Sequence, residues 1–95
     1  GEQQLVGELV NNINGQYWEV NVKNHFEIGD QLLLMTPSGN HYFRLENMWQ
    51  QDGQPTEIAP GSGHTVLIPI MDVAMKEEQL IFCMLIKIVG NLYTN

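Results

Sequence analysis

Turn signals recur about every 8–12 residues along most of this chain, a spacing that leaves room for short strands and little else. Each groups glycine with asparagine, aspartate or proline, residues suited to tight turns: Asn14-Gly15, Gly29-Asp30, Thr36-Pro37-Ser38-Gly39, Asp52-Gly53 and Pro60-Gly61-Ser62-Gly63. After the first turn, Tyr17–Val22 alternates apolar and polar side chains, which predicts a strand with one buried face. The spacing therefore predicts an all-β fold.

The segments between the turns are the expected strands. They are Gln4–Asn11, Tyr17–Val22, Gln31–Met35, Asn40–Met48, Glu57–Ala59, His64–Ile70 and Leu80–Val89. A turn of helix is expected within Asp72–Gln79, because alanine, methionine, lysine and glutamate favour helix. Several short strands on one core favour a small, distorted β-barrel of about six or seven antiparallel strands, since closing a sheet removes its exposed edges.

Composition narrows the function classes. The 95 residues suit one domain, and a hydrophobic content of 43% argues against intrinsic disorder. Acidic residues outnumber basic ones 11 to 4, giving a net charge of −7, which opposes nonspecific binding to nucleic acid and to anionic membranes. The longest apolar run, Leu80–Ile86, is far shorter than the roughly 20 residues of a membrane span. We therefore expect no membrane partner.

The cysteine usage and the start of the chain suggest its context. Cys83 is the single cysteine, so it cannot form an internal disulfide, and it lies in the most apolar stretch. This favours a reducing, cytoplasmic compartment and a buried, inert thiol. The chain starts at Gly1 without a basic-then-apolar leader, so we expect a domain excised from a larger protein.

A search for catalytic groups finds no convincing set. His25, His41 and His64 lie near predicted turns or strand starts, and none has a second ligand at metal-site spacing. Trp18 lies on the alternating apolar face, which predicts a core residue. No phosphate-binding glycine motif occurs. We therefore expect no catalytic residues, no metal and no cofactor in this chain.

One aromatic segment remains as a possible contact surface. Tyr42 and Arg44 are expected to face away from Phe43 and Leu45 on their strand, and Trp49 follows shortly after. A β-surface with several aromatic side chains can stack nucleotide bases. Arg44 is the only cation of this segment, however, so packing within a hairpin or against another domain is the favoured interpretation.

Three segments together carry a family resemblance. They are "VGEL" at Val6–Leu9, "VKNHFEIGDQLLLMTPSGN" at Val22–Asn40, and "LENMWQQDGQPTEIAPGSGHTVLIPI" at Leu45–Ile70. They resemble the C-terminal domain of peptidase family U32, a family that includes collagenase-like peptidases and bacterial proteins required for tRNA uridine hydroxylation. The match covers residues 4–70, whereas Met71–Asn95 departs from the pattern.

The resemblance implies a fold and a role. Residues 1–95 would form a single C-terminal accessory domain of a larger parent, similar to the small β-barrels of translation factors. The family's catalytic part is a separate N-terminal region, so no catalytic residue carries over. The implied function is to pack on that region or to orient its substrate, and the alternative is a module that contacts RNA or tRNA.

The landmarks that carry the resemblance have expected structural roles in turns or in the core. They are Gly7, Asn24, Phe26, Gly29, Asp30, Gly53 and Pro60. Gly29 is expected in a conformation that other residues avoid, with Asp30 accepting backbone hydrogen bonds beside it. Phe26 is expected to fill the core. We predict that Gly29→Val or Phe26→Ala lowers stability by roughly 2–4 kcal/mol.

Overall fold

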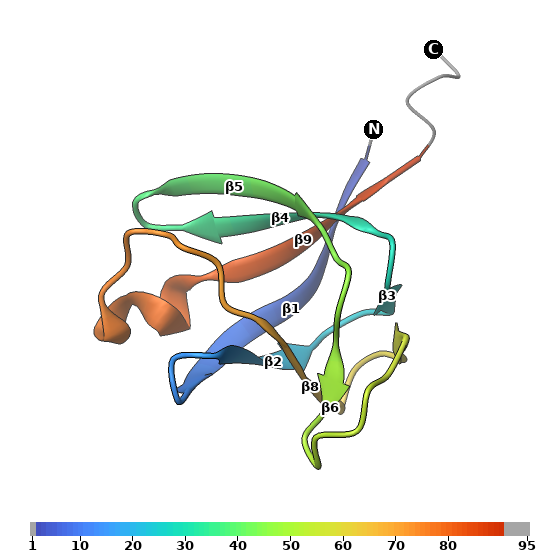
Figure 1. Ribbon diagram of the computed structural model, residues 1–95. Helices are drawn as coiled ribbons and strands as arrows, with labels where there is room; N and C mark the ends of the chain where they lie inside the picture. Colours follow the sequence, from blue (N-terminus) through green and yellow to red (C-terminus); the bar gives the residue numbers. More distant parts are fainter. Residues whose placement is uncertain (1, 91–95) are drawn as a thin grey trace.

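The computed structural model describes residues 2–90 and consists almost entirely of strands (Figure 1). Gly1 and residues 91–95, which belong to the predicted 1–95 domain and its Met71–Asn95 tail, lie outside the described residues. The elements are β1 (Glu2–Ile13), β2 (Tyr17–Val22), β3 (Phe26–Glu27), β4 (Gln31–Thr36), β5 (Gly39–Arg44), β6 (Trp49–Gln50), β7 (Ile58–Ala59), β8 (Thr65–Pro69), the 3₁₀-helix η1 (Glu77–Phe82) and β9 (Met84–Val89).

Seven of the strands form one antiparallel sheet in the order β5-β4-β9-β1-β2-β8-β6, and β3 pairs with β7 separately. The first and last strands, β1 and β9, are neighbours in the middle of the sheet. The predicted all-β, distorted barrel-like fold is thereby confirmed. The sheet curves but does not close, because its end strands β5 and β6 are not hydrogen-bonded to each other (Figure 1).

The β1–β2 hairpin forms where the sequence predicted it. Asn14 and Gly15 both have positive φ angles, of 56° and 71°, which match a hairpin turn of type I′. The Asn12 side-chain oxygen accepts a hydrogen bond from the Gly15 N–H at 2.8 Å. This turn sets the strand register, in which Ile13 pairs with Tyr17. In this register the apolar face of β2 is buried in the core.

The core lies on the concave side of the sheet. It combines residues of β1, β2, β4, β8 and β9 with the side chain of Phe26, which is completely buried. Trp18, Val20 and Val22 alternate into this core as the pattern of β2 predicted. Leu45 and Met48 continue it into the segment between β5 and β6.

The last third differs from the sequence prediction in one segment. A strand was expected from Leu80, but Leu80–Phe82 belongs to the 3₁₀-helix and the strand starts at Met84. Leu80 points into the core, whereas Ile81 and Phe82 are 71% and 65% exposed. An apolar run does not by itself distinguish a strand from a helical turn. The helical turn consequently lies further along the chain than Asp72–Gln79 suggested.

Candidate functional site

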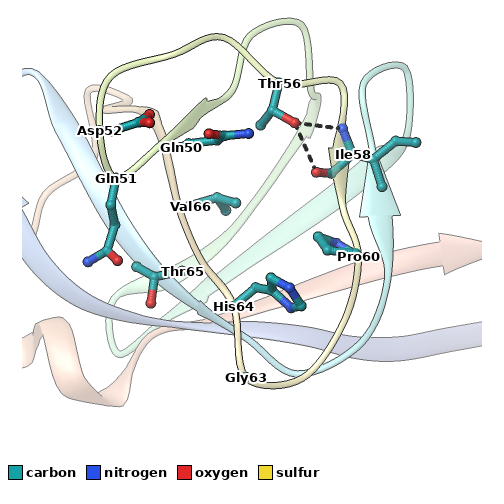
Figure 2. A pocket seen from close by; sticks show the side chains of 10 residues that line it. All are labelled: Gln50, Gln51, Asp52, Thr56, Ile58, Pro60, Gly63, His64, Thr65 and Val66. Atoms are coloured by element: carbon teal, nitrogen blue, oxygen red, sulfur yellow. Dashed lines mark hydrogen bonds between the residues drawn. The ribbon is translucent and has the colours of Figure 1, made fainter.

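A polar groove of about 680 Å³ lies between the loop after β6 and the segment that enters β8 (Figure 2). It is formed where two of the predicted turns, at Asp52-Gly53 and at Pro60-Gly61, face each other across the edge of the sheet. The lining residues are Gln50, Gln51, Asp52, Thr56, Ile58, Pro60, Gly63, His64, Thr65 and Val66.

The polar groups of this groove hold its own loops. The Thr56 hydroxyl donates to the Ile58 carbonyl at 3.2 Å and accepts from the Ile58 N–H at 3.4 Å. The Asp52 carboxylate accepts from the Gln54 N–H at 3.0 Å, which is an Asx-type turn. The His64 Nδ1 lies 3.2 Å from the Gly61 carbonyl oxygen. These contacts fix the loops in place.

The same contacts limit the chemistry that the groove can support. A serine, threonine or cysteine nucleophile is commonly activated by a hydrogen-bonded base. In the described residues 2–90, the His64 ring lies against a carbonyl oxygen and the Thr56 hydroxyl bonds to backbone groups. Within that same range, no three His, Cys, Asp or Glu side chains gather as metal ligands would. The polar groups with these contacts therefore serve the loops that form the groove.

The predicted turn residues Gly29 and Asp30 lie together between β3 and β4. Gly29 has a φ of +95°, and its N–H donates to the Leu45 carbonyl at 2.8 Å. Asp30 accepts a hydrogen bond from the Glu27 N–H at 2.8 Å and forms an ion pair with Lys87 at 3.4 Å. Asp30 thus joins the turn to the end of β9.

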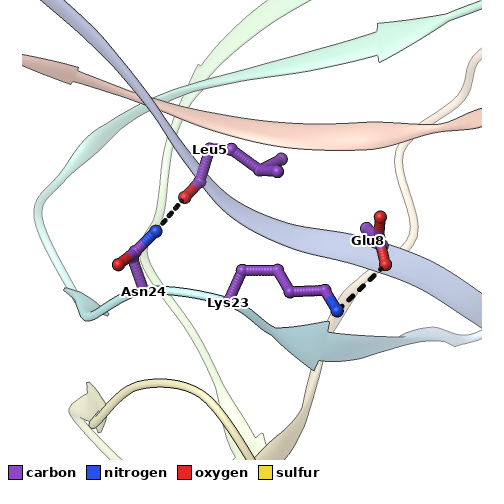
Figure 3. A network of polar contacts seen from close by, with 4 residues as sticks. All are labelled: Leu5, Glu8, Lys23 and Asn24. Carbon is purple, nitrogen blue, oxygen red and sulfur yellow. Dashed lines mark hydrogen bonds and ion pairs between the residues drawn. The ribbon is translucent and has the colours of Figure 1, made fainter.

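Asn24 connects the chain after β2 to β1 (Figure 3). Its side-chain N–H donates to the Leu5 carbonyl at 2.7 Å, beside the irregularity in the β1–β9 pairing between Leu5 and Gly7. Lys23 and Glu8 form an ion pair at 3.5 Å next to it. An added Cβ on Gly7 would lie 2.5 Å from a methyl carbon of Val20, so only glycine allows this close approach of β1 to β2.

Gly53 and Pro60 belong to the loops of the groove. Gly53 has a φ of +90°, and its N–H donates to the Gln50 carbonyl at 2.9 Å. Pro60 lines the groove directly. The turn landmarks had been assigned structural roles only. Local turn signals do not indicate that two of these loops form a shared cavity with Gln50, Gln51 and Thr65.

The aromatic contact residues of the sequence prediction are separated by the fold. Tyr42 and Arg44 lie on β5 at one end of the sheet, and both are exposed. Trp49 lies on β6 at the other end, where its ring meets that of Tyr17 edge-to-face at 5.0 Å. The strand expected over Asn40–Met48 ends already at Arg44, and Trp49 belongs to a separate strand. A contact role for these residues stays a prediction.

Cys83 is completely buried, and this burial raises the pKa of its thiol. Its sulfur donates towards the Met75 sulfur at 3.0 Å. Because the thiolate is the nucleophilic form, a raised pKa makes this cysteine less reactive. His41 differs from the other histidines, since its Nε2 is buried without a hydrogen-bond partner in the described structure.

Among residues 2–90, no helix combines the length and the hydrophobicity that crossing a bilayer requires.

The chain matches a family model described as the peptidase family U32 C-terminal domain over residues 1–81. It is 48% identical over 68 residues to tRNA hydroxylation protein P of Escherichia coli K12. It is 41% identical over 69 residues to the protein of that name from Haemophilus influenzae. Each match covers 72% of this chain but 15% of the relative's length.

Solved structures show the same fold. The crystal structure of the C-terminal domain of a Geobacillus thermoleovorans U32 family protein superposes with a TM-score of 0.73, covering 90% of this chain and 93% of that one at 19% identity. The selenomethionine variant of the domain gives a TM-score of 0.70 over 86% of this chain and 96% of its own, also at 19% identity. At this identity the likeness concerns the fold alone.

Proposed function

Because the chain belongs to the family of peptidase U32 C-terminal domains, we propose that it is a non-catalytic accessory domain of a larger polypeptide. Its role is to pack on the N-terminal catalytic region of that polypeptide or to orient the substrate there. One observation carries this proposal: the matched segment is only 15% of the length of its curated relatives. Most of such a protein, and with it the room for an active site, lies elsewhere.

Two parents are compatible with the family, a collagenase-like peptidase and a tRNA hydroxylation protein. The relatives at 48% and 41% identity both carry the second name, so we favour tRNA hydroxylation. Since tRNA is modified in the cytoplasm of bacteria, the proposal also places the domain there. The lone buried cysteine of the described residues is compatible with a reducing compartment.

The test compares three forms of the parent in a bacterial strain that lacks it. The full-length protein, a form without this domain and the domain alone are expressed, and hydroxylated nucleosides in bulk tRNA are measured by mass spectrometry. We expect the domain alone to restore nothing. Removal of the domain should lower hydroxylation at least about tenfold, because misplaced substrate reacts slowly. Full hydroxylation without the domain would contradict an assisting role.

A module that contacts tRNA is the second candidate, favoured by the names of the relatives. The net charge of −7 opposes it, because phosphate backbones attract lysine and arginine. An NMR titration of the isotopically labelled domain with bulk tRNA, at low and then moderate salt, separates the two. Shifts at Tyr42, Arg44 or the polar groove that persist at moderate salt would favour RNA contact. No shifts at either salt would favour packing.

A further inference from the structure

Strands β4 and β9 are apolar on both faces of the sheet. β4 contains the run Leu32–Met35, and β9 starts with Met84, Leu85 and Ile86. A strand with one face in water alternates apolar and polar side chains, whereas a strand covered on both faces reads as a continuous apolar run. The sequences of these two neighbouring strands are therefore typical of strands that are buried on both faces.

The main core lies against only one of these two faces. Leu32, Leu34 and Leu85 are completely buried and belong to the main core. Leu33 and Ile86 are also nearly buried, at 2% and 8% exposed, but they are not part of that core. They oppose each other across the β4–β9 pairing and so lie on the opposite side of the sheet.

These two residues are the centre of a second apolar surface, which we call the outer face. It consists of Leu5, Leu33, Met35, Tyr42, Met84 and Ile86. Tyr42, Leu33, Ile86 and Leu5 form one row across β5, β4, β9 and β1, and the pair Met35–Met84 forms the next row. Tyr42 is 63% exposed and Met84 is 36% exposed, so the rim of this surface faces solvent.

Few charged groups interrupt the outer face. Glu8 lies opposite Met84 and is already paired with Lys23, and Arg44 lies beyond Tyr42 on β5. Phe82, which is 65% exposed, stands two residues before Met84 at the start of β9. Contiguous apolar surfaces of this kind mark sites of contact with another protein surface.

We propose that the outer face docks against the N-terminal region of the parent polypeptide. This inference rests on the proposed function and specifies the surface that would be used. The family is one of C-terminal domains and the match covers 15% of a relative's length, so we expect the N-terminal region of the parent to precede this domain. The chain coming from that region enters through β1, and Leu5 of β1 is itself part of the outer face.

Charge and connectivity favour this occupant over the alternatives. Only 4 basic residues accompany 11 acidic ones, which opposes a nucleic acid on this surface. The same net charge of −7 opposes the approach of a second copy. A covalently joined partner, in contrast, is present at an effective concentration in the millimolar range, so a contact of modest area is sufficient.

The first experiment is hydroxyl-radical footprinting with mass spectrometry on the 95-residue chain and on the full-length parent. Met35, Tyr42 and Met84 react readily with this probe, and all three lie on the outer face. His64 in the polar groove is the internal reference. We expect oxidation of the three outer-face residues to fall at least about fivefold in the parent, as expected when an exposed surface becomes an interface core, while oxidation of His64 stays unchanged.

The second experiment uses a paired variant, Tyr42→Asp with Met84→Lys. Both side chains are exposed, and the new lysine lies opposite Glu8, so the 95-residue chain should keep its melting temperature. In the full-length parent, the two substitutions should weaken docking and so expose the junction before β1. Cleavage of that junction by a protease should become at least about tenfold faster, which corresponds to a loss of roughly 1.4 kcal/mol in docking free energy. Glu57→Lys, at an exposed residue just before β7 that belongs neither to this face nor to the groove lining, is the control and should change neither measurement.

The outcomes separate this inference from the proposed function. Protection of the groove but not of the outer face in the parent would overturn the inference and leave packing intact. No protected face, together with full tRNA hydroxylation by a parent that lacks the domain, would overturn both. Protection of the outer face that appears only when tRNA is added would overturn the inference in favour of RNA binding. Protection that increases with the concentration of the 95-residue chain would overturn it in favour of a second copy. The inference would also be overturned if the junction of the parent that carries both substitutions were cleaved no faster than that of the wild-type parent.

Discussion

The two faces of β4 and β9 carry almost the same side chains and have different surroundings. Leu34 on the inner face and Leu33 on the outer face are adjacent leucines, and both are nearly inaccessible to water. Leu34 belongs to the main core, whereas Leu33 lies outside it and has Tyr42 and Ile86 as its cross-strand partners. Burial of a single side chain therefore does not tell whether it lies in the core or under a surface that awaits a partner.

The comparison also separates two kinds of information in the sequence. The inner residues account for the stability of the domain by itself, because their apolar area is removed from water on folding. We expect the outer residues to contribute less to it, because Tyr42 and Met84 remain exposed in the folded domain. Mutations on the two faces should therefore behave differently in the domain and in its parent.

The largest effect is expected from Phe26→Ala, at the centre of the inner side. The ring is completely buried, so its removal leaves a closed cavity and should lower the free energy of unfolding by about 4 kcal/mol. Urea denaturation of the 95-residue chain measures this, with Phe26→Leu as the variant that keeps most of the volume. A loss below about 0.5 kcal/mol would mean that Phe26 is not a core residue in solution.

The matched pair Leu34→Ala and Leu33→Ala compares the faces directly. We expect about 3 kcal/mol for Leu34 and about 1–1.5 kcal/mol for Leu33, because the space left on the outer face can be filled by water or by the Tyr42 ring. Both values come from denaturant melts of the same chain. Equal losses would show that the outer cluster contributes to folding as the inner core does.

A turn effect of intermediate size is expected from Gly29→Val. At a φ of +95° a β-branched residue is strained, and we expect a loss of about 2 kcal/mol. Gly29→Asn is the control, since asparagine tolerates positive φ better and should cost less. The measurement is again the midpoint of denaturation. If the two substitutions prove equally tolerated, the turn between β3 and β4 adjusts without strain.

The smallest effect in the isolated domain is expected from Tyr42→Ser. The side chain is 63% exposed, so the free energy of unfolding should change by less than about 0.5 kcal/mol. Calorimetry of the 95-residue chain tests this value, and calorimetry of the full-length parent should show a larger decrease for the same substitution. An equal, small change in both proteins would remove Tyr42 from the proposed contact.

Much of the fold could be predicted from local signals. Asn14-Gly15 specifies its hairpin turn because both residues tolerate positive φ, and Tyr17–Val22 alternates as a half-buried strand must. A turn of helix was expected within Asp72–Gln79, but the extent of the 3₁₀-helix to Phe82 could not be predicted. Ile81 and Phe82 are apolar yet exposed, and the run from Leu80 has no period that distinguishes strand from helix.

The site was harder to predict, for a different physical reason. The polar groove brings the loop after β6 against Pro60 and His64, a contact fixed by the pairing of β6 with β8. Likewise, Tyr42 and Trp49 are close in sequence but lie at opposite ends of the sheet. Such placements depend on which distant strands pair, and local turn chemistry does not encode that choice.

The central position of β9 has a consequence for biosynthesis. In the seven-stranded sheet of the described residues, β9 lies between two groups of strands. It is the only link between the pair β5-β4 and the four strands β1, β2, β8 and β6. While the ribosome still holds Met84–Val89, the emerging chain can form hairpins but cannot join them. The seven-stranded sheet can therefore be completed only after β9, its last strand in sequence, has been translated and has left the ribosome.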